Sequence, residues 1–345
     1  MFDSENGDFD IQKNHINDLG EYVITAGLSN NGVLGKTNIN AKIIDGNTIT
    51  IDMFGNSFYR KFKYKMVTHA RVFSLIPKFN MSEKQGLYIV NSFKYLMFGF
   101  GYENMCSWAK IQNNKIQLPI KKGKIDFEFM DAYISELEEE RISELSAYLT
   151  VSGLDNYELS SEEKEALEIY NDMVFDEYKF KDIFNNIKQG RRLKKDDQII
   201  GNIPFVMSGR TNTGVVGYIS NPIALFSKNS ITIDIFGNSF YRNYDFGAGD
   251  DTGVYWNSEV QYPKETMLYF TTAMEKALFG KYSYGKKLRS SQSFNFKMQL
   301  PTKNNEIDFT YMELLISAVK KLVIKDVVLY ADNKINAIKK VISKN

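Results

Sequence analysis

Residues 48–60 read T-I-T-I-D-M-F-G-N-S-F-Y-R, and residues 230–242 read S-I-T-I-D-I-F-G-N-S-F-Y-R. Ile49 to Arg60 agree with Ile231 to Arg242 at 11 of 12 positions. The shift that carries Ile49 onto Ile231, here called the repeat offset, also carries the Leu-Pro pair at 118–119 and the Ile-Asp-Phe triplet at 125–127 onto identical residues at 300–301 and 307–309. Solenoid repeats have periods of roughly 20 to 50 residues, so a period this long predicts two tandem copies of one folded domain.

Length and composition agree with two domains. A chain of 345 residues suits two domains of about 150 residues each with connecting segments. With 43% apolar and 14% aromatic residues, each half can bury a core. The single cysteine, Cys106, excludes an internal disulfide and a multi-cysteine zinc site.

The start of the sequence does not have the pattern of a secretory signal. Residues 1–5, M-F-D-S-E, are acidic and lack a basic region followed by an apolar one. No apolar run approaches the roughly 18 residues that a membrane helix requires. These features predict a soluble, intracellular protein, cytoplasmic in location and without a membrane partner.

The net charge of +1 conceals an asymmetry along the chain. Residues 131–177 hold 15 acidic residues against Arg141 and Lys164, a local charge of −13, which leaves +14 on the remainder. A basic pair of domains joined to an acidic connector suggests contact with a polyanion. The alternative is an acidic, solvated helix beside ordinary basic surface.

Local patterns predict the same order of elements in both halves. Asparagine and spaced glycines predict tight turns at 26–35 and 209–217, between strand-like runs. The predicted strands are 22–25, 48–52, 72–76 and 115–119 in the first half, and 203–207 and 231–235 in the second. Helical spacing of apolar residues predicts helices at 83–98, 161–174 and 266–279.

A longer helix is predicted after each Ile-Asp-Phe triplet. The first begins at Asp126, runs for about 24 residues and ends near Gly153, a length of roughly 36 Å. The second begins at Asp308, and its part from 320 to 344 holds seven lysines against two aspartates. Because one helix is acidic and the other basic, they are predicted to pair as an antiparallel coiled coil that holds the two domains apart.

The interpretation is an α/β (α+β) protein with two tandem homologous domains, related by an approximate twofold axis through the paired helices. The predicted boundaries are 1–125 for the first domain, 126–177 for the connector helices, 178–307 for the second domain and 308–345 for the C-terminal spacer helix.

The motifs follow one another in a fixed order. In the second half Gly201–Phe205 runs into Asn212–Tyr218, and the Leu-Pro pair, the Ile-Asp-Phe triplet and a long helix come after it. This ordered set, written twice, resembles the DNA specificity subunits of restriction-modification systems, above all the two-domain subunits of type I and of type IIB or BcgI-like systems. The resemblance covers the chain to about Ala337.

The resemblance implies a target recognition domain in each half, and each domain would read one half of a split site in double-stranded DNA. It also implies that the two long helices dock methyltransferase subunits, with a nuclease, fused or separate, as a further partner. S-adenosylmethionine and Mg²⁺ would be bound by those partners, and no cofactor by this chain. The sequence departs from the repeat at its start, where only Phe2 stands opposite the lead-in that ends at Phe184, so the N-terminal edge of the first domain is expected to be formed differently.

Residues that are identical in the two copies are predicted to be scaffold, and polar residues that differ are candidates for reading different half-sites. A basic run at 190–195 is a candidate for phosphate contacts. For each candidate the alternative is an ordinary surface residue, and for the basic run a solvated loop. The predicted DNA contacts are Ser29, Asn30, Asn31, Lys61, Lys63, Arg71, Trp108, Lys110, Arg191, Arg192, Lys194, Lys195, Arg210, Thr211, Asn212 and Arg289.

No catalytic residue and no metal site is predicted in this chain. A DNA methyltransferase would need a catalytic Asn/Asp-Pro-Pro-aromatic motif, whereas Asn202–Phe205 lacks the first proline. Glu162 and Lys164 have the spacing of a nuclease motif but no strand precedes them. The alternatives left open are a stand-alone enzyme that modifies DNA and a tandem module that binds carbohydrate or protein.

Overall fold

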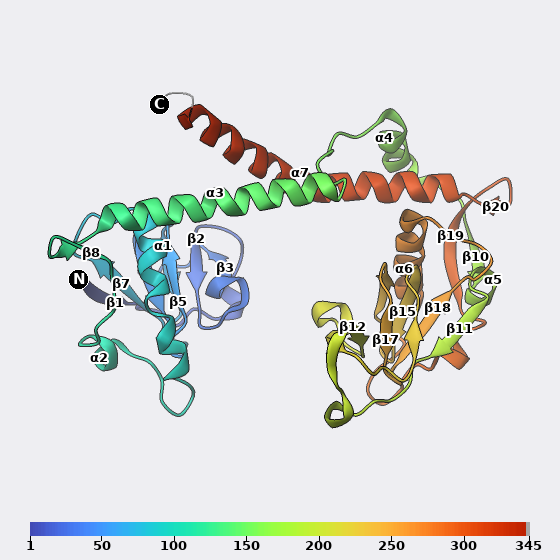
Figure 1. The fold of residues 1–345 in the computed structure, drawn as a ribbon, viewed down its shortest axis with the longest axis horizontal. Coiled ribbons are helices and arrows are strands. Elements are labelled where there is room, and N and C mark those ends of the chain that lie inside the picture. Colours follow the sequence, from blue (N-terminus) through green and yellow to red (C-terminus); the bar gives the residue numbers. More distant parts are fainter. Residues whose placement is uncertain (343–345) are drawn as a thin grey trace. The chain divides into compact units, whose positions relative to one another are not determined.

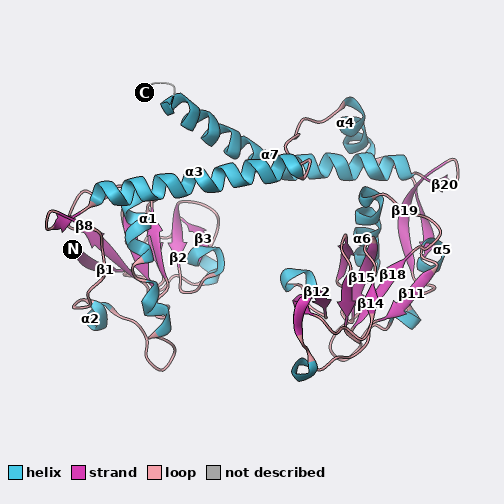
Figure 2. Cartoon of the chain, in the orientation of Figure 1, coloured by secondary structure: helices cyan, strands magenta, loops and turns pink. Residues whose placement is uncertain are grey.

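The computed structural model of the protein describes residues 1–342, which form two compact units (Figure 1). Unit 1 comprises Met1–Ala147 together with the end of the last helix from Asn333, and unit 2 comprises Tyr148–Asp332. Both units mix helices with sheets, as the sequence predicts (Figure 2). Lys344, the last of the seven lysines in the C-terminal segment, lies outside the described residues.

The main sheet of unit 1 has four antiparallel strands. The first copy of the repeated stretch forms a hairpin at one edge of this sheet, in which Thr48 lies opposite Arg60 and Ile51 opposite Ser57. In order across the sheet, the strands are β1 (Phe2–Asn6), β7 (Phe73–Pro77), β4 (Thr48–Ile51) and β5 (Ser57–Arg60).

All four residues of β4 are buried because both faces of this sheet are covered. On one face Ile49 and Ile51 join a core that includes Ile89 of helix α1 (Glu83–Asn91). On the other face the Thr48 hydroxyl lies 2.8 Å from the Tyr64 hydroxyl. Tyr64 belongs to a second sheet formed by β3 (Val33–Thr37), β2 (Glu21–Ile24) and β6 (Tyr64–Met66).

The prediction of one helix over 83–98 was wrong at its C-terminal end. Helix α1 stops at Asn91, and the backbone then bonds over three residues, from the Ser92 amide to the Ile89 carbonyl. A 3₁₀ helix, η3 (Lys94–Phe98), follows. This tighter path buries Leu96 against Gly55, at which a Cβ would lie only 2.6 Å from the Leu96 backbone.

Unit 2 repeats this arrangement at the repeat offset. Its main sheet consists of β11 (Asn186–Gln189), β18 (Thr252–Trp256), β15 (Ser230–Asp234) and β16 (Ser239–Arg242). The second sheet consists of β13 (Val215–Ile219), β12 (Ile200–Val206), β17 (Phe246–Ala248) and β14 (Leu225–Phe226). Helix α6 (Lys264–Leu278) packs against β15 and β16, as α1 packs against β4 and β5.

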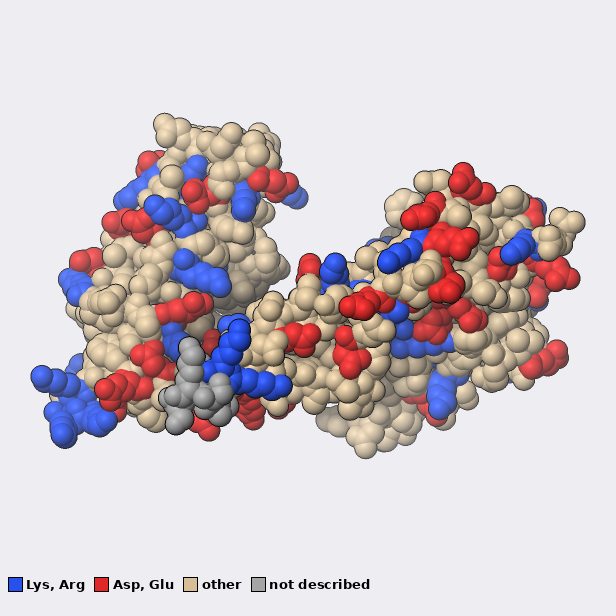
Figure 3. Space-filling view, turned by 90° about the horizontal axis from the view of Figure 1, so that it is seen from above, with Lys and Arg blue, Asp and Glu red and all other residues tan. Residues whose placement is uncertain are grey.

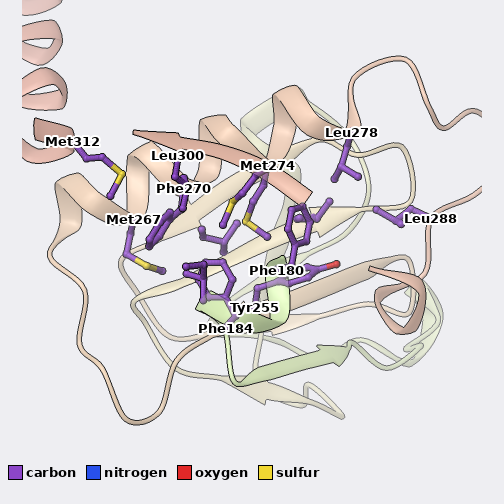
Figure 4. Close-up of a cluster of buried hydrophobic side chains, with 14 residues drawn as sticks. Phe180, Phe184, Tyr255, Met267, Phe270, Met274, Leu278, Leu288, Leu300 and Met312 are labelled. Carbon is purple, nitrogen blue, oxygen red and sulfur yellow. The ribbon is translucent and has the colours of Figure 1, made fainter. Parts of the chain in front are cut away.

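The core of unit 2 lies between α6 and this main sheet (Figure 4). Phe270 of α6 meets Phe184 edge to face, with ring centroids 5.6 Å apart. Phe184 follows α5 (Phe180–Ile183), so the segment before the sheet closes the core. The Tyr255 side chain of β18 is fully buried beside both phenylalanines of this segment.

The predicted strand at 115–119 does not form, whereas its repeat-mate does. In unit 2, β19 (Lys297–Lys303) pairs along its length with β10 (Phe175–Lys179) and then turns into β20 (Glu306–Ile307). No described strand of unit 1 lies where β10 would pair, so only the short hairpin of β8 (Ile120–Lys121) and β9 (Lys124–Ile125) remains. The N-terminal edge of unit 1 is therefore formed differently, by β1 alone.

Two long helices carry the charged segments. Helix α3 (Phe127–Val151) has 25 residues, and the Asp126 carboxylate caps it by accepting from the Phe129 amide at 3.0 Å. Helix α7 (Phe309–Ile342) has 34 residues and is capped in the same way by Asp308. The pairing of α3 with α7 stays a prediction. Within residues 1–342 no helix is both long enough and apolar enough to cross a membrane.

The helix predicted at 161–174 is shorter in the structure. It consists of α4 (Ser161–Glu168) and a 3₁₀ turn, η4 (Ile169–Asn171). The chain then extends into β10 to pair with β19, which ends the helix earlier than the sequence suggested. Unit 1 also contains a short helix, α2 (Trp108–Ile111).

Candidate nucleic-acid interface

The repeated stretch fixes a left-handed turn in unit 1. Asn30 and Asn31 have φ angles of 47° and 51°, a conformation that side chains rarely adopt without support. The Asp52 carboxylate accepts from the Gly27 amide at 2.8 Å, and the Arg60 guanidinium donates to the Asn31 carbonyl at 2.7 Å. The hairpin of β4 and β5 therefore holds the turn from both sides.

Unit 2 holds its turn in the same way. Asn212 and Thr213 have φ angles of 47° and 52°. Asp234 accepts from the Gly209 amide at 3.0 Å, and Arg242 donates to the Thr213 carbonyl at 2.5 Å. The prediction that identical residues of the repeat are scaffold is thus confirmed for the aspartate and the arginine of each copy.

The two arginines are charged although they are buried. Burial lowers the pKa of Arg60 to about 10, and it also lowers the pKa of Arg242. A pKa of about 10 leaves the Arg60 guanidinium protonated at neutral pH, and arginine side chains in general keep their proton in proteins, so each turn is held by a charged donor. The tips of the turns are exposed, and they carry the candidates Ser29, Asn30, Asn31, Thr211 and Asn212.

In unit 1 a cavity of about 790 Å³ lies at the end of the main sheet that is next to the left-handed turn. The Cys106 amide donates to the Met53 carbonyl at 2.8 Å, which brings the loop before α2 against the hairpin turn. The cavity is lined by Arg71, Trp108 and Lys110. Cys106 also borders it, but burial raises the pKa of its thiol to about 11, so the thiol is neutral.

Unit 2 has a cavity of about 780 Å³ at the equivalent place. Four lining positions of the two cavities coincide at the repeat offset. These pairs are Asn6 and Lys188, Gly7 and Gln189, Thr68 and Asp250, and Ser107 and Arg289. The repeat therefore places a cavity of similar size, but of different chemistry, in each unit.

The cavity of unit 2 is the more basic one. Four basic side chains and one acidic side chain line it, against two basic and one acidic in unit 1. Its basic residues are Lys188, Arg191, Arg192 and Arg289. The Lys188 ammonium lies 5.5 Å from the centre of the Trp256 ring, so an aromatic surface adjoins the cations.

Hydrogen bonds join the loops around this cavity. Gln189 donates to the Asp250 carbonyl at 3.0 Å and accepts from the Ser290 amide at 2.9 Å. Arg289 donates to the same Asp250 carbonyl at 2.6 Å. Gly190 has no room for a side chain, because a Cβ would lie 2.2 Å from the Gly249 carbonyl oxygen. The cations thus stand on loops that are tied to one another.

Both units match the family model for the type I restriction modification DNA specificity domain, over residues 1–147 and 174–329. The chain belongs to this family. It therefore carries two DNA specificity domains, one per unit, and it is a specificity subunit of a restriction-modification system that recognises DNA sequence.

Two relatives illustrate the match. The specificity subunit S.BcgI of a type II restriction enzyme from Heyndrickxia coagulans is 25% identical over 276 residues, which are 78% of this chain and 77% of the relative. The crystal structure of a type I restriction-modification S subunit from M. genitalium superimposes with a TM-score of 0.56 at 15% identity. That superposition covers 99% of this chain and 91% of the other, and it shows a shared fold.

The predicted contacts of the two specificity domains fall into separate places. Arg71, Trp108 and Lys110 line the cavity of the first domain, and Arg191, Arg192 and Arg289 line that of the second. Lys194 and Lys195 are exposed and follow Arg192 closely in the sequence, but they do not line the second cavity. Trp108 and Lys110 belong to the short helix α2, whereas Arg71, Arg191, Arg192, Arg289 and the turn tips lie in loops and turns, where binding residues commonly occur.

Lys61 and Lys63 lie elsewhere in the first specificity domain. Arg60 pairs with Thr48, whereas the cavity lies at the other end of β4, beyond Ile51. Lys61 forms an ion pair with Glu83 at 3.8 Å, and Lys63 forms one with Asp45 at 3.1 Å. The structure therefore does not bring these two lysines together with the other candidates.

Two candidates are engaged in bracing their own domain. The Arg210 guanidinium donates to the Asn238 side chain at 2.7 Å and to Glu275 at 3.1 Å. The Lys110 ammonium donates to the Asn104 side chain at 2.7 Å and to the Met105 carbonyl at 2.8 Å. The Arg210 guanidinium and the Lys110 ammonium would each have to break these hydrogen bonds before all of their N–H groups could donate to DNA.

The predicted contacts do not include Lys188 and Trp256, which the structure places at the second cavity. Lys188 stands opposite Asn6 in the repeat, so the rule of differing polar residues could have found it.

On the face shown in Figure 3, basic and acidic side chains are mixed, and the charge asymmetry along the sequence does not appear there as separate patches. Among the described residues, no three His, Cys, Asp or Glu side chains gather as a metal site would require.

Proposed function

We propose that this specificity subunit is non-catalytic, reads a split site in duplex DNA with one domain per half-site, and directs partner methyltransferase subunits to that site. The observation that carries the proposal is the pair of cavities at equivalent positions with different linings. A shared scaffold with exchanged side chains is what two different half-sites require.

The two linings suit different kinds of contact. Arginine and lysine neutralise phosphates, and arginine also recognises guanine through two parallel hydrogen bonds. The second domain, with Arg191, Arg192 and Arg289, is therefore proposed to supply most of the salt-dependent affinity. The first domain, with Asn6, Thr68 and Trp108 beside fewer cations, is proposed to depend more on polar and stacking contacts.

Catalysis is assigned to the partners. The methyltransferase subunits would bind S-adenosylmethionine, and Mg²⁺ would serve a nuclease that is fused to them or separate. Membership of a DNA specificity family supports this division of labour. The name of the relative S.BcgI, a specificity subunit of a restriction enzyme, supports it as well.

The test is the genome-wide methylation pattern of the source strain with and without this gene, read by single-molecule sequencing. We expect one split motif to lose its methylation on deletion and to regain it when the gene is restored. A gene copy with Arg191→Ala, Arg192→Ala and Arg289→Ala should not restore it, whereas one with Lys61→Ala should. An unchanged pattern, with the protein demonstrably produced, would contradict the proposal.

A further inference from the structure

A short loop in each unit contains none of the predicted DNA contacts. It covers residues 97–105 in unit 1 and 279–287 in unit 2, which correspond at the repeat offset, and we call each one the tyrosine loop of its unit. The Leu288 amide, just after the second loop, donates to the Ile235 carbonyl at 2.9 Å, as the equivalent amide does in unit 1. The residues that flank the loops are buried in the cores of their units: Leu96 and Cys106 in unit 1, and Leu278 and Leu288 in unit 2 (Figure 4).

Both tyrosine loops fold into the same tight hairpin. In unit 1 the Gly101 amide donates to the Asn104 carbonyl at 3.1 Å, and the Asn104 amide donates back to the Gly101 carbonyl at 3.2 Å. In unit 2 the backbones of Ser283 and Lys286 form the same two hydrogen bonds, at 3.1 Å and 3.0 Å. Each loop therefore has a narrow tip on a base that is fixed to the core.

The tyrosine loops lie next to the two cavities. Tyr102 and Glu103, at the tip of the loop in unit 1, line the first cavity. In unit 2 the loop is followed closely by Arg289, which lines the second cavity. Figure 1 shows the loop of unit 1 as the teal segment that projects beyond η3, at the end of the unit away from α3. A duplex that covers a cavity would therefore lie beside the tyrosine loop of that unit.

The two tips share one exposed tyrosine. Tyr102 and Tyr284 are the only identical pair in the two loops, and they are 75% and 82% exposed. Identical residues elsewhere in the repeat, such as Asp52 and Arg60, are buried scaffold. A tyrosine that is both shared and exposed suits a feature that two different half-sites have in common. Such half-sites differ in their bases but share the sugar-phosphate backbone.

The charges of the two tyrosine loops differ. The loop of unit 1 contains Glu103 and no lysine or arginine, whereas the loop of unit 2 contains no acidic residue. The Lys287 ammonium lies 4.6 Å from the centre of the Tyr284 ring, so a cation and an aromatic ring stand together on this loop. The lysines of the second loop are exposed and form no ion pair with a described residue: Lys281, Lys286 and Lys287.

We propose that the tyrosine loops hold the sugar-phosphate backbone of the duplex and do not read its bases, with the tyrosine hydroxyl donating to a phosphate. In unit 2 the lysines make this contact strong and salt-dependent, whereas Glu103 keeps it weak in unit 1. The inference rests on the proposed function, because its ligand is the duplex that the two domains read. It adds a part of each domain that fixes the duplex against the cavity whatever the half-site, as backbone contacts do.

Duplex binding by the full chain, followed by fluorescence anisotropy at several salt concentrations, tests this contact. One duplex carries the methylated motif, and in the other both half-sites are scrambled. Lys286→Ala with Lys287→Ala should lower the slope of log K against log salt concentration by about 2 on both duplexes and leave the ratio of their affinities unchanged. Tyr284→Phe should weaken binding to both duplexes about fivefold, because a phosphate loses its donor. Lys264→Ala with Lys303→Ala, at exposed lysines at the other end of α6 and in β19, is the matched control and should change neither quantity.

A gain of charge in unit 1 is an independent check. Glu103→Lys should raise the salt slope by about 1 on both duplexes, because the first loop acquires the charge that the second loop has. The bases of the methylated motif should stay the same. Thermal unfolding of all the variants should match that of the wild-type chain, since every substituted side chain is exposed.

Three results would overturn this inference alone. They are a salt slope of the Lys286 and Lys287 variant equal to that of the control, wild-type affinity of Tyr284→Phe for both duplexes, and a loss confined to the duplex with the motif, which would make the loop a reader of bases. A wild-type chain that does not prefer the motif over the scrambled duplex would instead overturn the proposed function.

Discussion

Arg242 is the fully buried side chain on which the turn of the second specificity domain depends. Its guanidinium donates to the Thr213 carbonyl, to the Thr232 hydroxyl at 3.0 Å and to the Tyr244 hydroxyl at 3.0 Å. No other described residue donates to that carbonyl, and Thr213 has a left-handed φ that side chains disfavour. The turn tip can therefore present Thr211 and Asn212 only while the arginine is in place.

Replacing Arg242 by methionine should destabilise unit 2 by about 3 to 5 kcal/mol, because buried acceptors lose their charged donor. The chain has two tryptophans, so a Trp108→Phe background leaves Trp256 of unit 2 as the only tryptophan, whose fluorescence is excited selectively over that of the tyrosines. Urea unfolding followed at Trp256 measures the effect. Arg192→Met, at an exposed arginine, should change stability by less than about 0.5 kcal/mol. Equal effects of the two substitutions would contradict the role given to Arg242.

The basic residues of the second cavity should set the salt dependence of DNA binding. Each phosphate contact contributes about 0.9 to the slope of log K against log salt concentration. Arg191→Ala with Arg192→Ala should therefore lower the slope by about 1 to 2, and Arg289→Ala by about 1. The measurement is duplex binding by anisotropy at several salt concentrations. Lys61→Ala, at the opposite end of the first domain and paired with Glu83, should leave the slope unchanged.

At the scale of the element, α4 is held to unit 2 by a contact that depends on pH. Burial alone would raise the pKa of Glu163, but the hydrogen bonds from Lys321 and Ser317 outweigh it and bring the pKa below its ordinary value of 4.5. The folded state thus favours the ionised carboxylate. Its contribution to stability is complete above pH 4.5 and is lost as the pH falls through the lowered value.

Glu163→Gln should therefore destabilise unit 2 by about 1 to 3 kcal/mol at pH 7, because Lys321 loses its charged partner. The difference from wild type should shrink as the pH falls from 4.5 through the lowered pKa of Glu163, because the glutamate of the unfolded chain is protonated first and that of the folded chain follows. Urea unfolding followed at Trp256 at pH 7 and at pH 3.5 checks both statements. Glu165→Gln, at an exposed residue of the same helix, serves as the control and should have little effect at either pH.

Strand β19 shows which elements the sequence predicts and which it does not. The hairpin of the repeated stretch follows from alternation and turn residues within one short segment, and it forms as predicted in both units. The strand at 115–119 has the same local pattern as β19 but forms no ladder, because its pairing partner is not local. Likewise α1 ends at Asn91, and the 3₁₀ helix after it packs Leu96 on Gly55, a contact between distant segments that no periodicity reveals.

The candidate site follows the same division at the scale of the whole molecule. Repeat comparison selects Arg71, Trp108 and Arg289 because each differs from its repeat-mate, and each lines a cavity. The same comparison selects Lys61 and Lys63, which the sheet register places at the other end of β4. Sequence identifies which residues differ between the copies, whereas the strand order decides which of them share a surface.

The length of the long helices should set the distance between the two half-sites. At 1.5 Å per residue, the 25 residues of α3 span about 37 Å, close to the roughly 34–36 Å of one turn of duplex DNA. If α3 and α7 pair as predicted and act as the spacer, the two half-sites should be centred roughly 10 base pairs apart. Duplicating seven residues in each helix, 137–143 in α3 and the equivalent 319–325 in α7, would lengthen both by about 10 Å and keep the apolar stripe in phase.

At about 3.4 Å per base pair, that change should widen the gap in the methylated motif by about three base pairs and leave the bases of each half-site unchanged. Single-molecule sequencing of methylated DNA from cells that carry the variant measures the gap and the half-sites together. A length-preserving variant, Ser143→Ala with Lys325→Ala, should keep the original motif. If cells that carry the duplicated helices still methylate the motif with its original gap, the long helices do not determine the distance between the half-sites. Contacts outside the long helices would then have to set that distance.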